Sequence, residues 1–347
     1  MKAFRRHAKE PRAARLEEVN VPEPGENEVL LRVSNCGICG SDLHAWLNHP
    51  GYEFVLEKVT FGHELSGIVE KVGPSVADWE IGDHAVMIAL QTHHDEEDTF
   101  CRQGLPQLSA RRRVQGLHLD GGMAEFVSVD TEFLIPVPEG LDMRLAALTE
   151  PLSVAEHCVG NRSSIEQDDK VLVTGPGIIG AFCAISARHR GAEVVIAGTE
   201  RDEKARLSAL RSIGFPTLTV GPDLPPLHEQ VKDHFGEEAD AHVEASGASP
   251  VLADAWQSLK MNGVVTVVAL YGAKVDFDVT QFVRRQIDVR VSYASSKPDY
   301  LSALDLLQQD AVNLDALVSF YPLEEAEKGF LDGEAQEVLK PMLSCMD

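Results

Sequence analysis

The sequence has few cysteines, no long apolar run and a shortage of basic residues. Six cysteines in 347 residues are too few for a disulfide scaffold, so a reducing compartment is expected. No apolar run approaches the roughly 20 residues of a membrane span, and residues 1–20 are too charged for a signal peptide. We therefore expect a cytoplasmic protein without a membrane partner.

The charge balance argues against nucleic acid as a partner. The 31 Lys and Arg residues are outnumbered by 55 Asp and Glu residues, which gives a formal net charge of −24, and carboxylates repel a phosphate backbone. The acidic composition suits a surface adapted to high salt, but an ordinary acidic protein has it too. With 44% hydrophobic residues, the chain is expected to be globular, and its length favours two domains.

A predicted β-α-β unit between Lys170 and Thr199 is typical of dinucleotide binding. A short apolar strand leads into the pattern G-x-G-x-x-G, and a helix and a second strand follow. The first glycine of such a pattern allows a tight turn, the second lets the backbone approach a pyrophosphate, and the third lets the helix pack on the sheet. N–H groups at the helix start then face the phosphates. The predicted cofactor-binding residues are Gly175, Gly177, Ile178, Ile179 and Gly180.

Alternating strands and helices after this unit predict a doubly wound parallel sheet. Because ligands bind at the carboxyl ends of parallel strands, Ser246 and Leu270 are expected on the nicotinamide side of the cofactor. Helices are expected over 202–213 and 251–261, and strands over 240–245, 264–270 and 287–293.

The end of the second strand decides between NAD and NADP. An NAD site usually has an acidic residue there, where this chain has Gly198. A glycine does not repel a 2′-phosphate, whereas Thr199 can donate a hydrogen bond to it and Arg201 can pair with it. Glu200 would favour NAD if it turned inward, and Arg201 could equally be an exposed residue at a helix start. We expect NADP in preference to NAD.

Three residues in the first half of the chain have the chemistry of metal ligands. Cys39, His63 and Glu64 offer a thiol, an imidazole and a carboxylate, the ligand types of a catalytic zinc with an open fourth position. Cys36 and Cys39 form a C-x-x-C pair, but no second such pair exists to complete a four-cysteine zinc site. By themselves the two cysteines could be a core pair or a redox pair.

Several motifs, taken in order, resemble the zinc-dependent medium-chain alcohol dehydrogenases. They are GICGSDLH, GHELSGIVEKVG, IGDHAV, LDGGMAEFV, LTEPLSVAEH, the glycine pattern near residue 175 and YPLEEAEKGF. TEPLSVAEH resembles the polyol (sorbitol-type) and threonine dehydrogenase branch. The resemblance covers essentially the whole chain and implies an α/β protein. Its two domains would be a GroES-like β-rich catalytic domain, 1–155 and 295–347, and a doubly wound parallel-sheet (Rossmann) dinucleotide-binding domain, 156–294.

The resemblance also implies one catalytic zinc and a path for the substrate proton. Cys36 would not be a zinc ligand. The metal residues would be Cys39, His63, Glu64 and Glu150, the last either as a direct ligand or as the group that holds the zinc water. The catalytic residues would be Ser41, which takes the substrate proton, His44, which passes it on, and Asp42, which orients the ligand histidine.

One segment departs from the family pattern, in which four close cysteines often hold a second, structural zinc. Residues 92–114 contain a single cysteine, and the motif spacing puts Asp95, Asp98 and Ser109 where the other cysteines would stand. One thiol with Asp and Ser is a poor structural zinc site. We therefore expect no structural zinc, and a solvated loop for the two histidines at the start of the segment.

The function implied is hydride transfer from a secondary alcohol, a polyol or sugar, to NAD(P), giving a ketone or lactone. The alternatives are a threonine-type or simple alcohol dehydrogenase, and a non-catalytic NAD(P)H-binding protein. The family forms homodimers or homotetramers through the nucleotide domain, often by pairing exposed sheet edges. Candidates for the substrate pocket are Leu43, Trp46, His49, Glu64, Leu270 and Tyr293.

Overall fold

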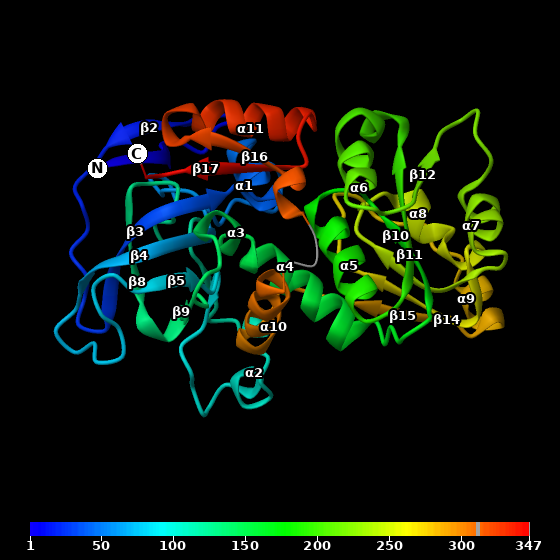
Figure 1. Ribbon diagram of the computed structural model, residues 1–347, viewed down its shortest axis with the longest axis horizontal. Coiled ribbons are helices and arrows are strands. Elements are labelled where there is room, and N and C mark those ends of the chain that lie inside the picture. The colour runs from blue at the N-terminus through cyan, green and yellow to red at the C-terminus, as the bar shows by residue number, and fades with distance from the viewer. Residues whose placement is uncertain (310–312, 347) are drawn as a thin grey trace. The chain divides into compact units, whose positions relative to one another are not determined.

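The computed structural model describes residues 1–309 and 313–346, which form two compact units. The first unit contains residues 1–153, 295–309 and 318–346, and the second contains 154–294 and 313–317. Most of the helices and strands of both are labelled in Figure 1. Within the described ranges, no helix is long and apolar enough to span a membrane.

The first unit is built on a seven-stranded sheet. Val29, Leu31 and Val33, which share one face of β3, are buried in the core, and Leu30 on the opposite face is buried as well. The spatial order is β16 (Val318–Pro322), β17 (Lys340–Ser344), β3 (Glu28–Gly37), β4 (Glu64–Val72), β5 (His84–Met87) and β9 (Leu134–Pro136), with β8 (Phe126–Asp130) also paired to β3. Two smaller sheets pair β1 (Lys2–Arg6) with β2 (Ala14–Glu18), and β6 (Leu90–Gln91) with β7 (Arg113–Val114).

An aromatic cluster anchors the first helix of this unit. The ring of Phe330 lies 5.3 Å from Trp46, 5.1 Å from Phe4 and 5.8 Å from Phe61. Because Trp46 is only 1% exposed, it belongs to the core, and its expected place in a substrate pocket is wrong. The helices of the unit are α1 (Gly40–Trp46), α2 (Thr99–Arg102), α3 (Met143–Ala146), α10 (Lys297–Gln308) and α11 (Ala326–Ala335), and α4 (Thr149–Glu156) continues into the second unit.

The second unit contains a six-stranded parallel sheet, as predicted. Numbered from β10, its strands lie in the order 3-2-1-4-5-6, so the strand order reverses between β10 and β13, the place where such folds bind their ligands. The strands are β12 (Thr217–Val220), β11 (Glu193–Thr199), β10 (Lys170–Thr174), β13 (Ala239–Glu244), β14 (Leu259–Val267) and β15 (Asp288–Val291). The helices are α5 (Ile178–His189), α6 (Ser208–Ser212), α7 (Leu227–Phe235), α8 (Ser249–Ala253) and α9 (Val279–Arg285).

Several boundaries in this unit differ from prediction; the helix expected over 202–213 is a regular α-helix only over Ser208–Ser212, and the strands expected to reach 270 and 293 end at Val267 and Val291. The helix expected over 251–261 ends at Ala253, because fully buried Leu259 pairs with Ala239 and begins β14. β12 and α7 were not predicted at all. The four residues of β12, Thr-Leu-Thr-Val, alternate polar and apolar side chains, but the strand is short and all four residues are half-buried.

Candidate functional site

Strand pairing in the first unit brings the three candidate ligands together. β3 and β4 are antiparallel, and their register places Gly37 opposite Glu64. Cys39, just after β3, therefore meets His63, just before β4. The ligand atoms of Cys39, His63 and Glu64 lie within 4.8 Å of one another.

Asp42 connects two of these ligands. It is fully buried on α1, where its Oδ2 accepts a hydrogen bond from the backbone N–H of the N-cap residue Cys39 at 3.0 Å. Its Oδ1 lies 3.5 Å from Nδ1 of His63. The other ring nitrogen of His63, Nε2, lies 3.2 Å from Oγ of Ser41. The Asp42 carboxylate and the Ser41 hydroxyl thus face the two ring nitrogens of His63 from opposite sides, as is common around a metal-ligating imidazole.

The electrostatics of this group suit a cation. Burial alone would lower the pKa of His63, but the Asp42 carboxylate and the Cys39 thiol raise it well above its usual value. Burial raises the pKa of Asp42, and the neighbouring imidazole offsets part of that shift. Neither Asp42 Oδ1 nor His63 Nδ1 completes a well-formed hydrogen bond. A thiol, an imidazole and a carboxylate in a site rich in acidic groups match the preferences of zinc.

Lys340 is part of the site and was missed by sequence reasoning. β17 pairs antiparallel with β3 and places Met342 opposite Gly37, so the side chain of Lys340 reaches Glu64. Its Nζ donates to Glu64 Oε2 and, at 3.0 Å, to the carbonyl oxygen of Ile38. Burial alone would lower the pKa of Lys340, but Glu64 raises it. The available signal was a single charged residue in the apolar run VLKPML.

Gly37 makes room for this buried ion pair. A Cβ at residue 37 would clash with the Glu64 carboxylate and would lie 2.9 Å from Cε of Lys340. Cys36, its neighbour, is fully buried and is not in the group of ligand atoms. Gly37 therefore has a steric role in the site, because only a residue without a side chain fits beside the ion pair.

The structure does not bring Glu150 into the group of three ligand atoms. Burial raises the pKa of Glu150 to about 7, with His63 lowering it and Glu64 raising it further. Glu150 therefore feels the charges of the site and keeps part of its surface accessible at the start of α4.

His44, the second predicted proton carrier, lies exposed on α1. Its Nδ1 is 2.8 Å from Nδ1 of His49, and its ring stacks on Tyr52 at 5.3 Å. Burial, and then the proximity of His49, lower the pKa of His44. At neutral pH its ring is thus mainly neutral and able to accept a proton.

In the second unit, each glycine of the G-x-G-x-x-G pattern has a distinct steric environment. Gly175 has φ +94°, and a Cβ there would lie 2.6 Å from the backbone nitrogen of Ser246. Gly177 is the N-cap of α5 and has open space where a Cβ would be. A Cβ at Gly180 would clash with the carbonyl oxygen of Gly175. A turn, an open approach and close helix packing are the three features that a pyrophosphate site needs.

The end of β11 lacks a carboxylate in the position typical of NAD sites. Gly198 is buried, and a Cβ there would lie 2.7 Å from Cγ of Pro176. The Thr199 hydroxyl donates to Asp202 Oδ2 at 2.8 Å, and Asp202 pairs with Arg206 at 3.3 Å. In this structure, therefore, the hydroxyl expected to bind a 2′-phosphate is engaged within the protein. A cavity of about 520 Å³ is lined by Gly175, Gly198, Thr199, Asp202, His242 and Ser246, among others.

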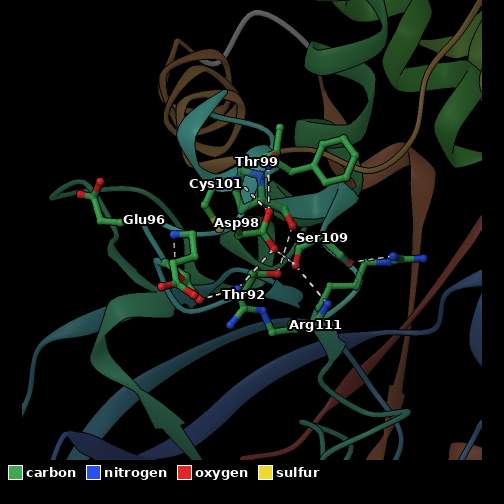
Figure 2. A network of polar contacts seen from close by, with 12 residues as sticks. Thr92, Glu96, Asp98, Thr99, Cys101, Ser109 and Arg111 are labelled. Carbon is green, nitrogen blue, oxygen red and sulfur yellow. Dashed lines mark hydrogen bonds and ion pairs between the residues drawn. The ribbon is translucent and has the colours of Figure 1, made fainter.

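The segment that would hold a structural zinc is organised by a carboxylate instead (Figure 2). Asp98 is the N-cap of α2 and accepts hydrogen bonds from the backbone N–H of Phe100 at 2.8 Å and from the Ser109 hydroxyl at 2.6 Å. Arg111 pairs with both Asp95 and Asp98. These contacts connect the positions at which the family pattern would have cysteines.

A second set of possible ligand atoms lies beside this segment. His93, Asp130 and Glu132 offer atoms within 4.8 Å of one another, but they are largely exposed. Nδ1 of His93 is already hydrogen bonded to Glu132 Oε2 at 2.7 Å. In the described part of the chain, only this set and the Cys39 group bring three such atoms together.

Comparison with known proteins adds independent information. A model described as alcohol dehydrogenase GroES-like domain matches residues 25–139, and one described as zinc-binding dehydrogenase matches residues 179–309. A sorbitol dehydrogenase of Halalkalibacterium halodurans is 31% identical over 338 residues, 96% of each chain. A D-arabitol-phosphate dehydrogenase of Enterococcus avium is 30% identical over 90% of this chain and 88% of its own. A zinc-binding dehydrogenase from Sinorhizobium meliloti 1021, solved bound to NADP, has a TM-score of 0.88, 26% identity and coverage of 99% and 98%. The predicted fold class, a GroES-like domain with a Rossmann domain, is confirmed.

Proposed function

Because this chain belongs to the zinc-dependent medium-chain alcohol dehydrogenases, we propose that it oxidises a secondary alcohol of a polyol or sugar, with NADP as the preferred cofactor. The observation that carries the proposal is the convergence of Cys39, His63 and Glu64 around a histidine oriented by Asp42. A non-catalytic dinucleotide-binding protein would not need this arrangement.

We assign residues 1–155 and 295–347 to the catalytic domain, and 156–294 to the dinucleotide-binding domain. The two compact units support this division, although 154, 155 and 313–317 group with the second unit. Residues 310–312 and 347 lie outside the described part.

Cys39, His63 and Glu64 would hold the catalytic zinc, and Glu150 would ligate it or hold its water. When bound, zinc supplies Lewis acidity that makes an alcohol hydroxyl easier to deprotonate. Lys340 pairs with the Glu64 carboxylate and holds it in place inside the protein. The carboxylate of Asp42 faces Nδ1 of His63, which leaves Nε2 on the opposite side of the ring, next to Ser41.

Ser41 would receive the proton of the substrate hydroxyl. Its Oγ lies next to the ring of His63, and a hydroxyl can accept one proton while donating its own. His44, three residues later on α1, would be the next acceptor. A Ser41→Ala variant is expected to lose at least about 100-fold in kcat, the scale of general acid–base catalysis, with an unchanged zinc content. A full rate in this variant would exclude Ser41 from the proton path.

The nicotinamide cofactor, which supplies the hydride acceptor, is assigned to the glycine turn and the end of β11. Gly198 supports NADP, because no carboxylate there opposes a 2′-phosphate. Arg201 would pair with that phosphate, and the Thr199 hydroxyl would have to release Asp202 to join it. Dissociation constants for NADP and NAD should differ in favour of NADP, and Arg201→Ala should abolish the difference. Equal binding of both cofactors by the unaltered protein would contradict the preference.

The substrate class rests on relatives whose names refer to sorbitol and arabitol phosphate. A screen of cofactor reduction at 340 nm against polyols, aldoses, threonine and simple alcohols, at low and at molar salt, tests it. Turnover of polyols or sugars supports the proposal, and turnover of threonine or simple alcohols alone would favour the alternative.

We further propose that the chain holds one zinc and no structural metal. The network around Asp98 supports this, because it satisfies the positions that a metal would otherwise connect. Metal analysis of the purified protein should give one zinc per chain, and none in Cys39→Ser. Two metals per chain would contradict the proposal. If one of them remained in Cys39→Ser and was lost in His93→Ala, the second metal would belong to the set of His93, Asp130 and Glu132.

The edge strand β15 supports assembly through the second unit. Val289 and Val291 on this strand are 45% and 64% exposed, and Val283 on α9 is 71% exposed. An unpaired strand edge with apolar side chains is a site for pairing with a second copy. We propose a homodimer or homotetramer, testable by light scattering.

The free thiols of all six cysteines support a reducing, cytoplasmic location.

A further inference from the structure

Glu244 is a buried carboxylate at the carboxyl end of β13. It is 0% exposed and pairs in register with Thr174 of β10 and Val267 of β14. It therefore lies at the carboxyl ends of the strands, at the point where the strand order reverses, which is where such folds bind their ligands. Among the described residues it forms no ion pair, and hydrogen bonds from neutral donors satisfy its oxygens.

Both oxygens of Glu244 accept hydrogen bonds from loops at this edge. Oε1 accepts from the backbone N–H of Ser246 at 2.7 Å, from that of Gly247 at 3.1 Å and from the Ser246 hydroxyl. Oε2 accepts from the hydroxyl of Tyr271. Burial and this contact raise the pKa of Tyr271, so its hydroxyl stays a donor over the working pH range.

These bonds join two loops that are separate in sequence. The turn at 245–248 follows β13, and the loop that carries Tyr271 follows β14. The same turn packs against the cofactor glycines, since a Cβ at Gly175 would lie 2.6 Å from the Ser246 nitrogen. Gly247 has φ +67°, and a Cβ there would lie 3.0 Å from the carbonyl oxygen of Leu270. One carboxylate thus joins the turn that carries Ser246 to the loop that carries Leu270, the two residues expected to contact the cofactor.

We propose that Glu244 is a positioning residue for the dinucleotide, holding the Ser246–Gly247 turn and the Tyr271 loop in the binding geometry. The proposal rests on the proposed function, because it takes the dinucleotide to bind at this edge. Glu244 acts through the two loops and need not touch the cofactor itself. It acts on the shared part of the site and not on the 2′-phosphate, so NAD and NADP should depend on it equally.

The experiment compares Glu244→Gln and Tyr271→Phe with the unaltered protein, all zinc-loaded. Glutamine has nearly the same shape, but its amide nitrogen cannot accept a hydrogen bond, so one set of donors loses its acceptor. We expect Glu244→Gln to weaken NAD and NADP binding by a similar factor, about tenfold, the effect of one lost charge-assisted hydrogen bond. Tyr271→Phe, which removes one donor, should cause a smaller loss. Glu229→Gln, an exposed carboxylate on α7, removes the same charge and should change nothing.

A positioning role also predicts which kinetic constants change. KM for the cofactor should rise in Glu244→Gln, while zinc content and KM for the alcohol stay within twofold. Unchanged dissociation constants in Glu244→Gln and Tyr271→Phe would overturn the inference, whether or not the variants are less stable. If Glu244→Gln does not fold, Tyr271→Phe decides alone. An unaltered protein that binds neither cofactor would overturn the proposed function first, and this inference with it.

Discussion

Removal of the Lys340 ammonium should destabilise the zinc-free protein far more than the zinc-loaded one. Lys340 and Glu64 are each 1% exposed and are paired inside the first unit. A Lys340→Met variant keeps much of the side-chain volume and leaves the Glu64 carboxylate buried without its counter-charge. Breaking one half of a buried ion pair costs about 3–5 kcal/mol. We expect a loss of this size in the free energy of unfolding when zinc is absent.

Zinc should recover part of this loss. A cation held by Cys39, His63 and Glu64 would supply positive charge beside the carboxylate that Lys340 no longer neutralises. Zinc should then stabilise Lys340→Met more than it stabilises the unaltered protein, by about 1–3 kcal/mol. The measurement is urea unfolding of both proteins with and without saturating zinc.

Two controls separate this effect from a general loss of charge. Lys328→Met removes an ammonium that is 62% exposed on α11, and should change stability by less than about 0.5 kcal/mol. Glu64→Gln combined with Lys340→Met removes both charges and should be more stable without zinc than Lys340→Met alone. The reasoning would be refuted if Lys340→Met behaved like Lys328→Met, or if its loss were the same with and without zinc.

Three further predictions concern other parts of the chain. Burial lowers the pKa of His242 to about 3. The stability that the neutral imidazole contributes is therefore present above the unfolded pKa of about 6.5 and is lost as the pH falls toward 3, with a loss of about 2 kcal/mol at pH 5. The variant His242→Asn should flatten that part of the stability–pH curve relative to the unaltered protein. Asp98→Ala should lower the local stability of residues 92–114 by about 1–3 kcal/mol and speed their amide hydrogen exchange. Glu96→Ala, which removes a side chain that is 88% exposed, should do neither. Equal exchange in both variants would exclude Asp98 as the organising residue. Cys39→Ser should lose zinc and activity but bind the dinucleotide with an unchanged dissociation constant, and full activity without metal would rule out the zinc mechanism.

Local patterns were sufficient for the elements whose signals are short in range. The G-x-G-x-x-G turn, α5 and the flanking strands lie within one continuous stretch, so backbone preference and apolar spacing specify them together. Asp42 and Cys39 lie at the start of the same helix. Asp42 is the third residue after the N-cap residue Cys39, and this spacing alone lets its side chain reach the backbone N–H of Cys39. The ligand set itself was proposed from residue types and from resemblance, and the structure brings three of its four members together.

Long-range pairing decided what those patterns could not. The helix expected to reach residue 261 ends early because Leu259 gains a strand partner and full burial, and this contact outweighs local helix propensity. The same holds for Glu244, whose partners Ser246 and Tyr271 belong to loops after different strands. Propensity and spacing describe a chain only over a few residues.

The sequence by itself determined the family, the two kinds of domain and the chemical types in the site, because ordered motifs carry these directly. Only the tertiary structure decided how the charges in the site are balanced. Lys340 reaches Glu64 through the antiparallel pairing of β17 with β3, from the far end of the chain. A buried carboxylate needs a partner in space and not in sequence, so this part of the site became visible only when the strands were paired.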